Sequence, residues 1–243
     1  MKVLVLDFDG VIADSQMECL FVGFNTYLKF NKNTKLKHSK IVEEYKKLRP
    51  YVIDAFCYYV IFYIIENKII IKDQNDYSNL RKGLAEGIYA AFVEMFYSER
   101  KRLISNNINE WLALIKPYGN IIPAIRMLSN NFHLAISTNN RKFTIDTFSK
   151  KHGIAPKIVI DSSFGSDKKV HIENIKNRLG VNFSDIYFVD DQIKNFDKLL
   201  PLRVNCYLAT WGYNTQKQHE EAKKLGTVLL TQENFYETFA KVK

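Results

Sequence analysis

Carboxylates gather where apolar runs of this sequence end. The opening stretch MKVLVLDFDGVIADS leads from a strand-like run into Asp7 and Asp9. A second pair, Asp190 and Asp191, ends the run DIYFVDD, and Asp161 ends KIVIDSS. Charge at a buried strand end is unfavourable without compensation, and clustered carboxylates repel one another unless a cation lies between them. Hard oxygen ligands of this kind favour Mg²⁺.

Hydroxyl and amino groups follow the same kind of run. FHLAIST ends at Ser137 and Thr138, with Asn139 next, and Lys168 and Lys169 open the helical pattern after KIVIDSS. Ligands of open α/β sheets bind at the carboxyl ends of the strands. We therefore expect the carboxylates, a hydroxyl and a lysine to meet at one sheet edge.

The elements that would position these groups alternate after Pro117. Short apolar strands separated by helices are typical of a parallel sheet covered on both faces. The predicted strands are 2–6, 132–138, 157–163, 185–191, 204–210 and 227–230, and the predicted helices are 120–131, 141–153, 168–180, 192–201 and 232–241.

Residues between the first strand and Pro117 carry only helical patterns, with apolar residues spaced three and four apart. The predicted helices are 15–30, 38–48, 51–68, 76–105 and 108–115. The sequence thus predicts a Rossmann-like, three-layer α/β core of residues 1–14 and 117–243. An all-helical cap of residues 15–116 is inserted after the first strand.

Composition limits the class of protein. The chain has 243 residues, 47% of them hydrophobic, and a formal net charge of +9. A basic surface favours anionic partners, but the Lys and Arg runs are scattered, so we expect no nucleic-acid partner. The apolar run 55–65 is shorter than the roughly 20 residues of a membrane span. Three dispersed cysteines and no secretory signal pattern predict a cytoplasmic protein without membrane association.

The sequence resembles the haloacid dehalogenase-like superfamily of phosphohydrolases through four motifs in order. These are DFDGV after an N-terminal strand, LAISTNN with its strand-end hydroxyl, DKKVHIENI with its lysine, and FVDDQIKN with its paired acids. The continuation VIADS is similar to the phosphoglycolate phosphatase and β-phosphoglucomutase branch. The resemblance covers residues 1–15 and about 117–235, and the helical segment carries no matching motif.

The resemblance implies a nucleophilic role for Asp7, which would form an aspartyl-phosphate. Asp9 would act as general acid and then base. Mg²⁺ would be held by Asp7, the backbone carbonyl of Asp9 and Asp191, with Asp190 acting directly or through a water molecule. Asn195 lies where some relatives carry another Asp, which leaves its role open.

For phosphate binding the resemblance implies Gly10, Thr138, Asn139 and Lys168. Ser137 stays an alternative to Thr138, because strand register decides which hydroxyl points into the site. Lys169 likewise stays an alternative to Lys168.

The implied activity is Mg²⁺-dependent hydrolysis of a small phosphorylated metabolite. A phosphomutase with the same aspartyl-phosphate chemistry is the alternative, and a catalytically silent binding protein is a third hypothesis. The cap would select the substrate, with Lys46, Arg49 and Tyr51 as candidate contacts or simply as an exposed basic helix end. ATWGYNT is interpreted as a structural turn with Trp211 packed, and both a monomer and a homodimer stay open.

Overall fold

The computed structural model describes residues 1–38 and 41–242, so Ser39 and Lys40 of the predicted helix 38–48 lie outside the described residues. The chain forms two compact units. One combines Met1–Asp14 with Lys116–Lys243, and the other is Ser15–Ile115. Among the described residues, no helix is both long enough and apolar enough to cross a membrane.

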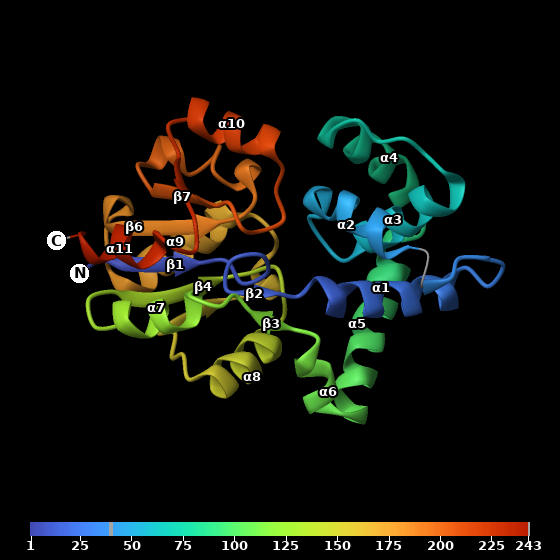
Figure 1. Ribbon diagram of the computed structural model, residues 1–243, viewed down its shortest axis with the longest axis horizontal. Coiled ribbons are helices and arrows are strands. Elements are labelled where there is room, and N and C mark those ends of the chain that lie inside the picture. Colours follow the sequence, from blue (N-terminus) through green and yellow to red (C-terminus); the bar gives the residue numbers. More distant parts are fainter. Residues whose placement is uncertain (39–40, 243) are drawn as a thin grey trace. The chain divides into compact units, whose positions relative to one another are not determined.

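A six-stranded parallel sheet forms the centre of the first unit (Figure 1). Its order is β5-β4-β1-β6-β7-β8. The strands are β1 (Val3–Leu6), β4 (His133–Ser137), β5 (Ile158–Ile160), β6 (Ile186–Asp190), β7 (Asn205–Ala209) and β8 (Val228–Leu230). The first strand in the sequence is thus central in the sheet, paired with β4 on one side and β6 on the other. The predicted Rossmann-like α/β class is confirmed.

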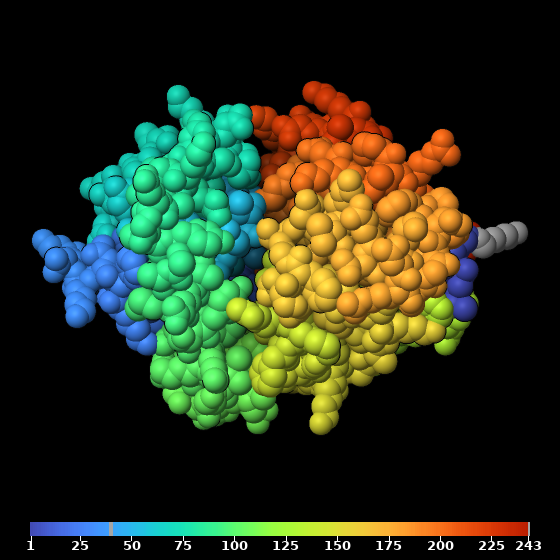
Figure 2. All heavy atoms as spheres, turned by 180° about the vertical axis from the view of Figure 1, so that it is seen from behind, coloured from blue at the N-terminus to red at the C-terminus, as the bar shows by residue number. Residues whose placement is uncertain are grey.

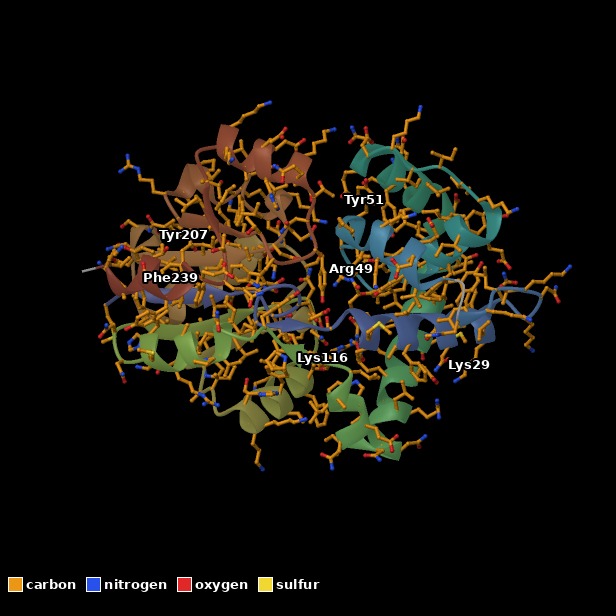
Figure 3. All side chains as sticks on the ribbon, viewed as in Figure 1. Lys29, Arg49, Tyr51, Lys116, Tyr207 and Phe239 are labelled. Atoms are coloured by element: carbon orange, nitrogen blue, oxygen red, sulfur yellow. The ribbon has the colours of Figure 1, made fainter. Side chains whose placement is uncertain are left out.

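Helices cover both faces of this sheet, as strands with two apolar faces require. On one face, Val5 of β1 and Phe188 of β6 share a buried cluster with Ile172 of α9 (Lys168–Leu179) and Ala222 of α10 (Gln216–Lys224). The other face is covered by α7 (Ile121–Leu128), α8 (Lys142–His152) and α11 (Phe235–Ala240). Figure 3 shows Phe239 of α11 near Tyr207, with ring centroids 5.0 Å apart.

In the C-terminal part of the chain, one predicted helix was wrong and one helix was missed. Residues 192–201 form two 3₁₀ turns, η5 (Ile193–Asn195) and η6 (Leu200–Leu202), because the Asp190 side chain accepts the Gln192 amide proton and starts a local turn. Helix α10 was missed because only Ala222 of its residues is buried, which leaves no apolar period. Its usable signal is the capping box of Thr215 and Gln218.

Six α-helices make up the second unit in its described part. They are α1 (Gln16–Phe30), α2 (Val42–Leu48), α3 (Phe56–Asn67), α4 (Gln74–Ala85), α5 (Tyr89–Asn106) and α6 (Ile108–Ala113). The single helix predicted over 76–105 is two helices, because the chain turns at Glu86 and Gly87, where φ is +78°. Figure 2 shows the side chains of α4 and α5 as a continuous teal-to-green surface.

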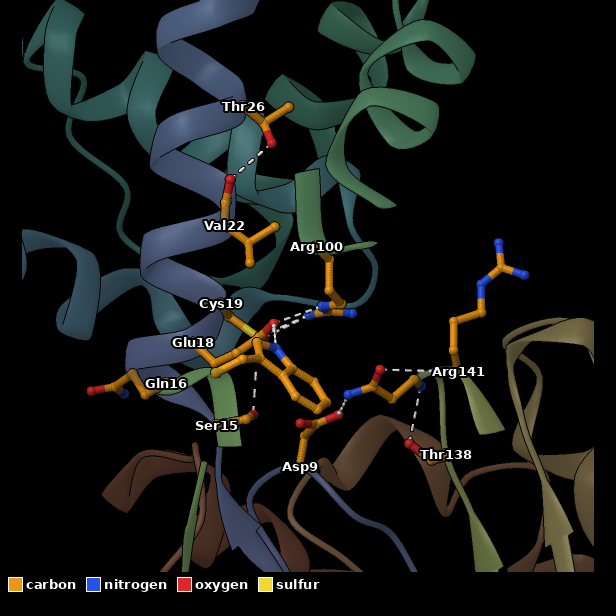
Figure 4. Close-up of polar contacts among 12 residues, drawn as sticks. Asp9, Ser15, Gln16, Glu18, Cys19, Val22, Thr26, Arg100, Thr138 and Arg141 are labelled. Atoms are coloured by element: carbon orange, nitrogen blue, oxygen red, sulfur yellow. Dashed lines mark hydrogen bonds and ion pairs between the residues drawn. The ribbon is translucent and has the colours of Figure 1, made fainter. Parts of the chain in front are cut away.

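A buried ion pair in the helical unit joins a residue near its start to helices near its end. Glu18 of α1 accepts hydrogen bonds from Arg100 Nε of α5 at 2.7 Å and Trp111 Nε1 of α6 at 2.9 Å. Figure 4 shows the Glu18–Arg100 contact. These bonds join the first helix of the unit to its last two.

A two-stranded ribbon, β2 (Ala13–Asp14) with β3 (Lys116–Pro117), lies at the junction between the units. Lys116 pairs with Asp14 and so belongs to the α/β unit, whereas the sequence had assigned it to the cap. Tyr213 donates its phenolic proton to Asp14 Oδ1 at 2.8 Å, which fixes this ribbon to the core of the α/β unit.

Candidate active site

Period-two alternation brings side chains from three strands to one place. In β1, Val3 and Val5 face the cluster that contains α9, and Asp7 continues this alternation just beyond the strand. Asp190 follows Ile186 and Phe188 in the same way in β6, and Ser137 follows Ala135 in β4. The three strand ends therefore face the first turn of α9.

Three carboxylates lie together at this edge. Asp7, Asp190 and Asp191 are all buried, and each offers an oxygen within 4.8 Å of the others. Lys168, the first residue of α9, donates to Asp7 Oδ1 at 3.0 Å and lies 3.8 Å from Asp190 Oδ2. One lysine thus faces three buried carboxylates.

Burial and charge both act on Asp7. Loss of solvent raises the pKa of this carboxyl well above its usual range, and the nearby carboxylates Asp190 and Asp191 raise it further. The ammonium of Lys168 opposes these effects and lowers the pKa. The pKa of Lys168 is itself raised by these carboxylates, Asp7 first, although burial opposes the shift.

A close-packed loop holds Asp191. The Tyr213 amide donates to Asp191 Oδ2 at 2.6 Å. Gly212 and Gly10 leave room for this carboxylate: a Cβ on Gly212 would lie 2.3 Å from Asp191 Cβ, and one on Gly10 would lie 2.1 Å from Asp191 Oδ2. Gly10 also has a φ of +88°, which favours glycine. The interpretation of this loop as a structural turn with Trp211 packed did not include the contact with Asp191.

Asp190 is oriented by the turn that follows it. The Gln192 amide donates to Oδ1 at 2.8 Å, and Asn195 Nδ2 donates to Oδ2 at 2.9 Å. Asn195 therefore contacts a member of the carboxylate cluster.

Asp9 and Asp161 lie outside the carboxylate cluster. Asp9 is half-buried and accepts a hydrogen bond from Asn140 Nδ2 at 3.4 Å. Its metal contact through the backbone carbonyl stays a prediction. Asp161 lies at the expected sheet edge, directly after β5, but its carboxylate accepts the amide protons of Lys142 and Ser163 at the starts of two other elements.

The two candidate hydroxyls point to different partners. Ser137 Oγ lies 3.0 Å from Nδ1 of His171 on α9. Thr138 Oγ1 accepts the Asn140 amide proton at 3.0 Å, so its own proton can be donated elsewhere (Figure 4). This geometry favours Thr138 for contact with a phosphoryl group, with half-buried Asn139 next to it.

The two candidate lysines also differ in burial and in their contacts. Lys168 is 3% exposed and contacts Asp7, and Lys169 lies on the surface 3.8 Å from Glu173. The structure thus brings Lys168, and not Lys169, to the carboxylates.

The helical-unit candidates have structural partners. Lys46 is exposed and pairs with Glu43 at 2.9 Å, and the Tyr51 ring stacks on Tyr77. Arg49 is buried rather than exposed at a helix end, and Figure 3 shows it near Tyr51 in the helical unit.

Sequence reasoning missed the pairing of Ser137 with His171, which lie 34 positions apart in the sequence. His171 is buried, and burial followed by the charge of Lys168 lowers its pKa to about 4. The signal that could have found it is the three-residue spacing from Lys168, which puts both side chains on one helix face.

A model of haloacid dehalogenase-like hydrolases matches residues 1–196. The chain belongs to the haloacid dehalogenase-like hydrolase family. This confirms the resemblance found in the four motifs and makes the chain a hydrolase by family. No curated protein sequence matches the chain.

Solved structures share the fold of this hydrolase over its whole length. A predicted phosphatase from Clostridium acetobutylicum has 14% identity and a TM-score of 0.66, with 100% of both chains covered. A predicted phosphoglycolate phosphatase from Haemophilus somnus has 12% identity and a TM-score of 0.66, covering 98% of this chain and 97% of that one. A candidate β-phosphoglucomutase from Thermotoga maritima has 17% identity and a TM-score of 0.57, with 100% of both chains covered.

The donor set of this hydrolase fits a divalent cation. Its three carboxylates are buried at the carboxyl ends of neighbouring strands, and oriented amides hold two of them. Buried carboxylates in excess over lysine require a positive charge, and oxygen-only donors suit a hard cation. The family membership and the cluster agree on this point.

Proposed function

We propose that this hydrolase is a Mg²⁺-dependent phosphatase that acts on a small organic phosphomonoester through an aspartyl-phosphate. The observation that carries the proposal is the position of Asp7. It is a buried carboxylate within the cluster, and Lys168 Nζ lies 3.0 Å from its Oδ1. Such a carboxylate is suited to nucleophilic attack on phosphorus.

In the first step an Asp7 oxygen attacks phosphorus, and the bond from phosphorus to the leaving oxygen breaks. Asp9 delivers a proton to that oxygen, and Asn140 holds the Asp9 carboxyl at 3.4 Å. Thr138 donates its hydroxyl proton to a phosphoryl oxygen, and Lys168 balances the negative charge that develops on the phosphoryl group.

In the second step Asp9 takes a proton from water, whose oxygen attacks phosphorus. The bond between Asp7 and phosphorus breaks, which releases inorganic phosphate and restores the free carboxylate. Asp7, Asp190 and Asp191 would hold Mg²⁺, which supplies positive charge that keeps Asp7 ionised and neutralises the phosphate oxygens.

Two variants test the nucleophile and the proton carrier separately with p-nitrophenyl phosphate. Asp7→Asn should be folded and inactive, because an amide cannot attack phosphorus. Asp9→Asn should release one equivalent of nitrophenolate in a burst and then stall, because this leaving group needs no proton but the water step needs a base. Mass spectrometry should find the phosphoryl group on the Asp7 peptide. Retained turnover in Asp7→Asn would refute the nucleophile assignment.

A sugar phosphate distinguishes the phosphatase from the phosphomutase. Release of inorganic phosphate supports the proposal, and formation of an isomer without phosphate release would replace it.

A panel of about a hundred phosphorylated metabolites, ranked by kcat/KM, would then identify the substrate class. We propose that the helical unit makes the selecting contacts, as lids of this kind commonly do.

A further inference from the structure

His171 lies at the centre of a hydrogen-bonded chain that ends at Asp7. Its Nε2 is 3.0 Å from the Gly165 carbonyl oxygen, and its Nδ1 is 3.0 Å from Ser137 Oγ. Lys168 Nζ donates to the Ser137 carbonyl oxygen at 2.6 Å and to Asp7 Oδ1 at 3.0 Å. Ser137 of β4 thus contacts His171 through its side chain and Lys168 through its backbone carbonyl.

The donors and acceptors available fix the direction of both hydrogen bonds that His171 makes. A carbonyl oxygen only accepts, so His171 Nε2 carries the proton that it donates to Gly165. In the neutral ring Nδ1 is then an acceptor, and Ser137 donates its hydroxyl proton to it. The Ser137 proton is therefore directed to His171, and Thr138 has the hydroxyl that can contact a phosphoryl oxygen.

The two α9 side chains depend on the same strand end. His171 and Lys168 are three residues apart on one face of α9, which packs against β4. The histidine ring fixes this first turn both to Ser137 and to the Gly165 loop. A shift of Ser137 would move the carbonyl oxygen that holds the Lys168 ammonium.

We propose that His171 is a positioning residue, which fixes Ser137 so that its carbonyl holds the Lys168 ammonium against Asp7. This inference rests on the proposed function for its effect on rate. Its geometric part is independent of that function. It assigns a role to a buried histidine that no step of the reaction uses directly.

Three variants with a matched control test the proposal. His171→Leu removes both hydrogen bonds, Ser137→Ala removes only the hydroxyl, and His171→Asn keeps an oxygen that can accept from Ser137. Ile175→Ala is the control, because Ile175 is equally buried on α9 but has no polar contact with the site. Its stability should fall without a change in the Lys168 contacts.

The first measurement does not require activity. In ¹⁵N-labelled protein the Lys168 ammonium should give a ¹H–¹⁵N signal, because burial and hydrogen bonds slow proton exchange. His171 should show the Nε2–H tautomer at neutral pH. His171→Leu should lose the Lys168 signal, and His171→Asn and Ile175→Ala should keep it. A Lys168 signal unchanged in His171→Leu, or lost equally in Ile175→Ala, would overturn the proposal.

The second measurement is steady-state kinetics on p-nitrophenyl phosphate with Mg²⁺. His171→Leu should lower kcat by about 10- to 100-fold, with little change in KM, because a misplaced charge acts on the transition state. The double variant with Ser137→Ala should be no slower than His171→Leu, and His171→Asn should recover most of the loss. Additive losses would show that the two residues act separately and would overturn the proposal. An inactive wild type would refute the proposed function and leave the NMR result to decide on His171.

Discussion

Replacing Gly212 with alanine tests whether the loop around Tyr213 holds Asp191 in place. The new Cβ would lie 2.3 Å from Asp191 Cβ and 2.5 Å from the Gly10 carbonyl oxygen, and neither atom can rotate away. Carbon atoms normally approach to about 3.5–4.0 Å, so Asp191 or the loop must move by roughly 1 Å. Overpacking of this kind costs about 1–3 kcal/mol of unfolding free energy.

The larger expected effect is on metal binding. The movement would break or lengthen the 2.6 Å hydrogen bond from the Tyr213 amide to Asp191 Oδ2. Loss of a contact that orients a metal ligand typically weakens metal affinity by about 10- to 100-fold. Calorimetric titration of Mg²⁺ into the folded variant should therefore give a Kd raised by this factor, with circular dichroism used to confirm the fold.

Gly212 does not lie at a positive φ, so its variant tests the collision alone, and a second glycine tests backbone strain alone. Gly226 has a φ of +73° with no atom near its Cβ position, so Gly226→Ala should lose about 1–2 kcal/mol from strain alone. Its Mg²⁺ affinity should equal that of the wild type. If Gly212→Ala folds and binds Mg²⁺ as tightly as the wild type does, the loop does not hold Asp191 and the reasoning is wrong.

Three further predictions concern charged side chains. With p-nitrophenyl phosphate, Lys168→Met should lower kcat at least 100-fold and Lys169→Met less than 2-fold, because only Lys168 contacts Asp7. Equal losses in the two variants would contradict the choice of Lys168. The Arg102 hydrogen bond lowers the pKa of Glu99 from 4.5 to about 2, so its stabilisation is complete above about pH 4.5 and is lost as the pH falls toward 2. Glu99→Gln should thus cost about 1–2 kcal/mol in urea unfolding at pH 7 and almost nothing near pH 2, and a pH-independent loss would argue against this linkage. Glu18→Gln should cost about 3–5 kcal/mol, because it leaves a buried arginine without its counter-charge, and a Tm within 2 °C of the wild type would exclude this.

The α/β fold could be predicted from the sequence because its strands are short, mostly apolar and separated by helical periods. The positions of Asp7, Asp190 and Lys168 followed from the rule that polar residues at the carboxyl ends of strands share one edge. Two alternatives were left open. The choice of hydroxyl depends on strand register, and the choice of lysine depends on which face of α9 meets the sheet. The alternation from Ala135 to Ser137 directs that serine to α9, and this could have been read once the pairing with β1 was known.

The remaining parts of the site depend on contacts between distant segments. The bond between Tyr213 and Asp191 spans 22 positions, and that between Ser137 and His171 spans 34. The first contact has no local spacing that marks it in one sequence. The second is marked only by the three-residue spacing of His171 from Lys168, which places the ring on the right helix face but does not identify Ser137 as its partner. Asp161 shows the opposite case. It is a strand-end carboxylate that was expected to join the cluster, but it accepts backbone amide protons at the starts of α8 and a 3₁₀ turn. Strand-end position predicts which residues can meet, and competing local hydrogen bonds decide which do.

The insertion between β1 and β4 poses a folding problem that the junction contacts reduce. The central strand must pair with strands that come more than a hundred residues later, and closing such a loop is entropically costly. Within the helical unit, Glu18 near one end is bonded to Trp111 near the other. Within the α/β unit, Asp14 pairs with Lys116 directly across the junction. If the helical unit folds on its own core, these contacts bring its two ends close together, and the sheet then has to close only a short connection. Because Asp7 directly follows the strand that this closure positions, the short connection also favours the contact between Asp7 and Lys168.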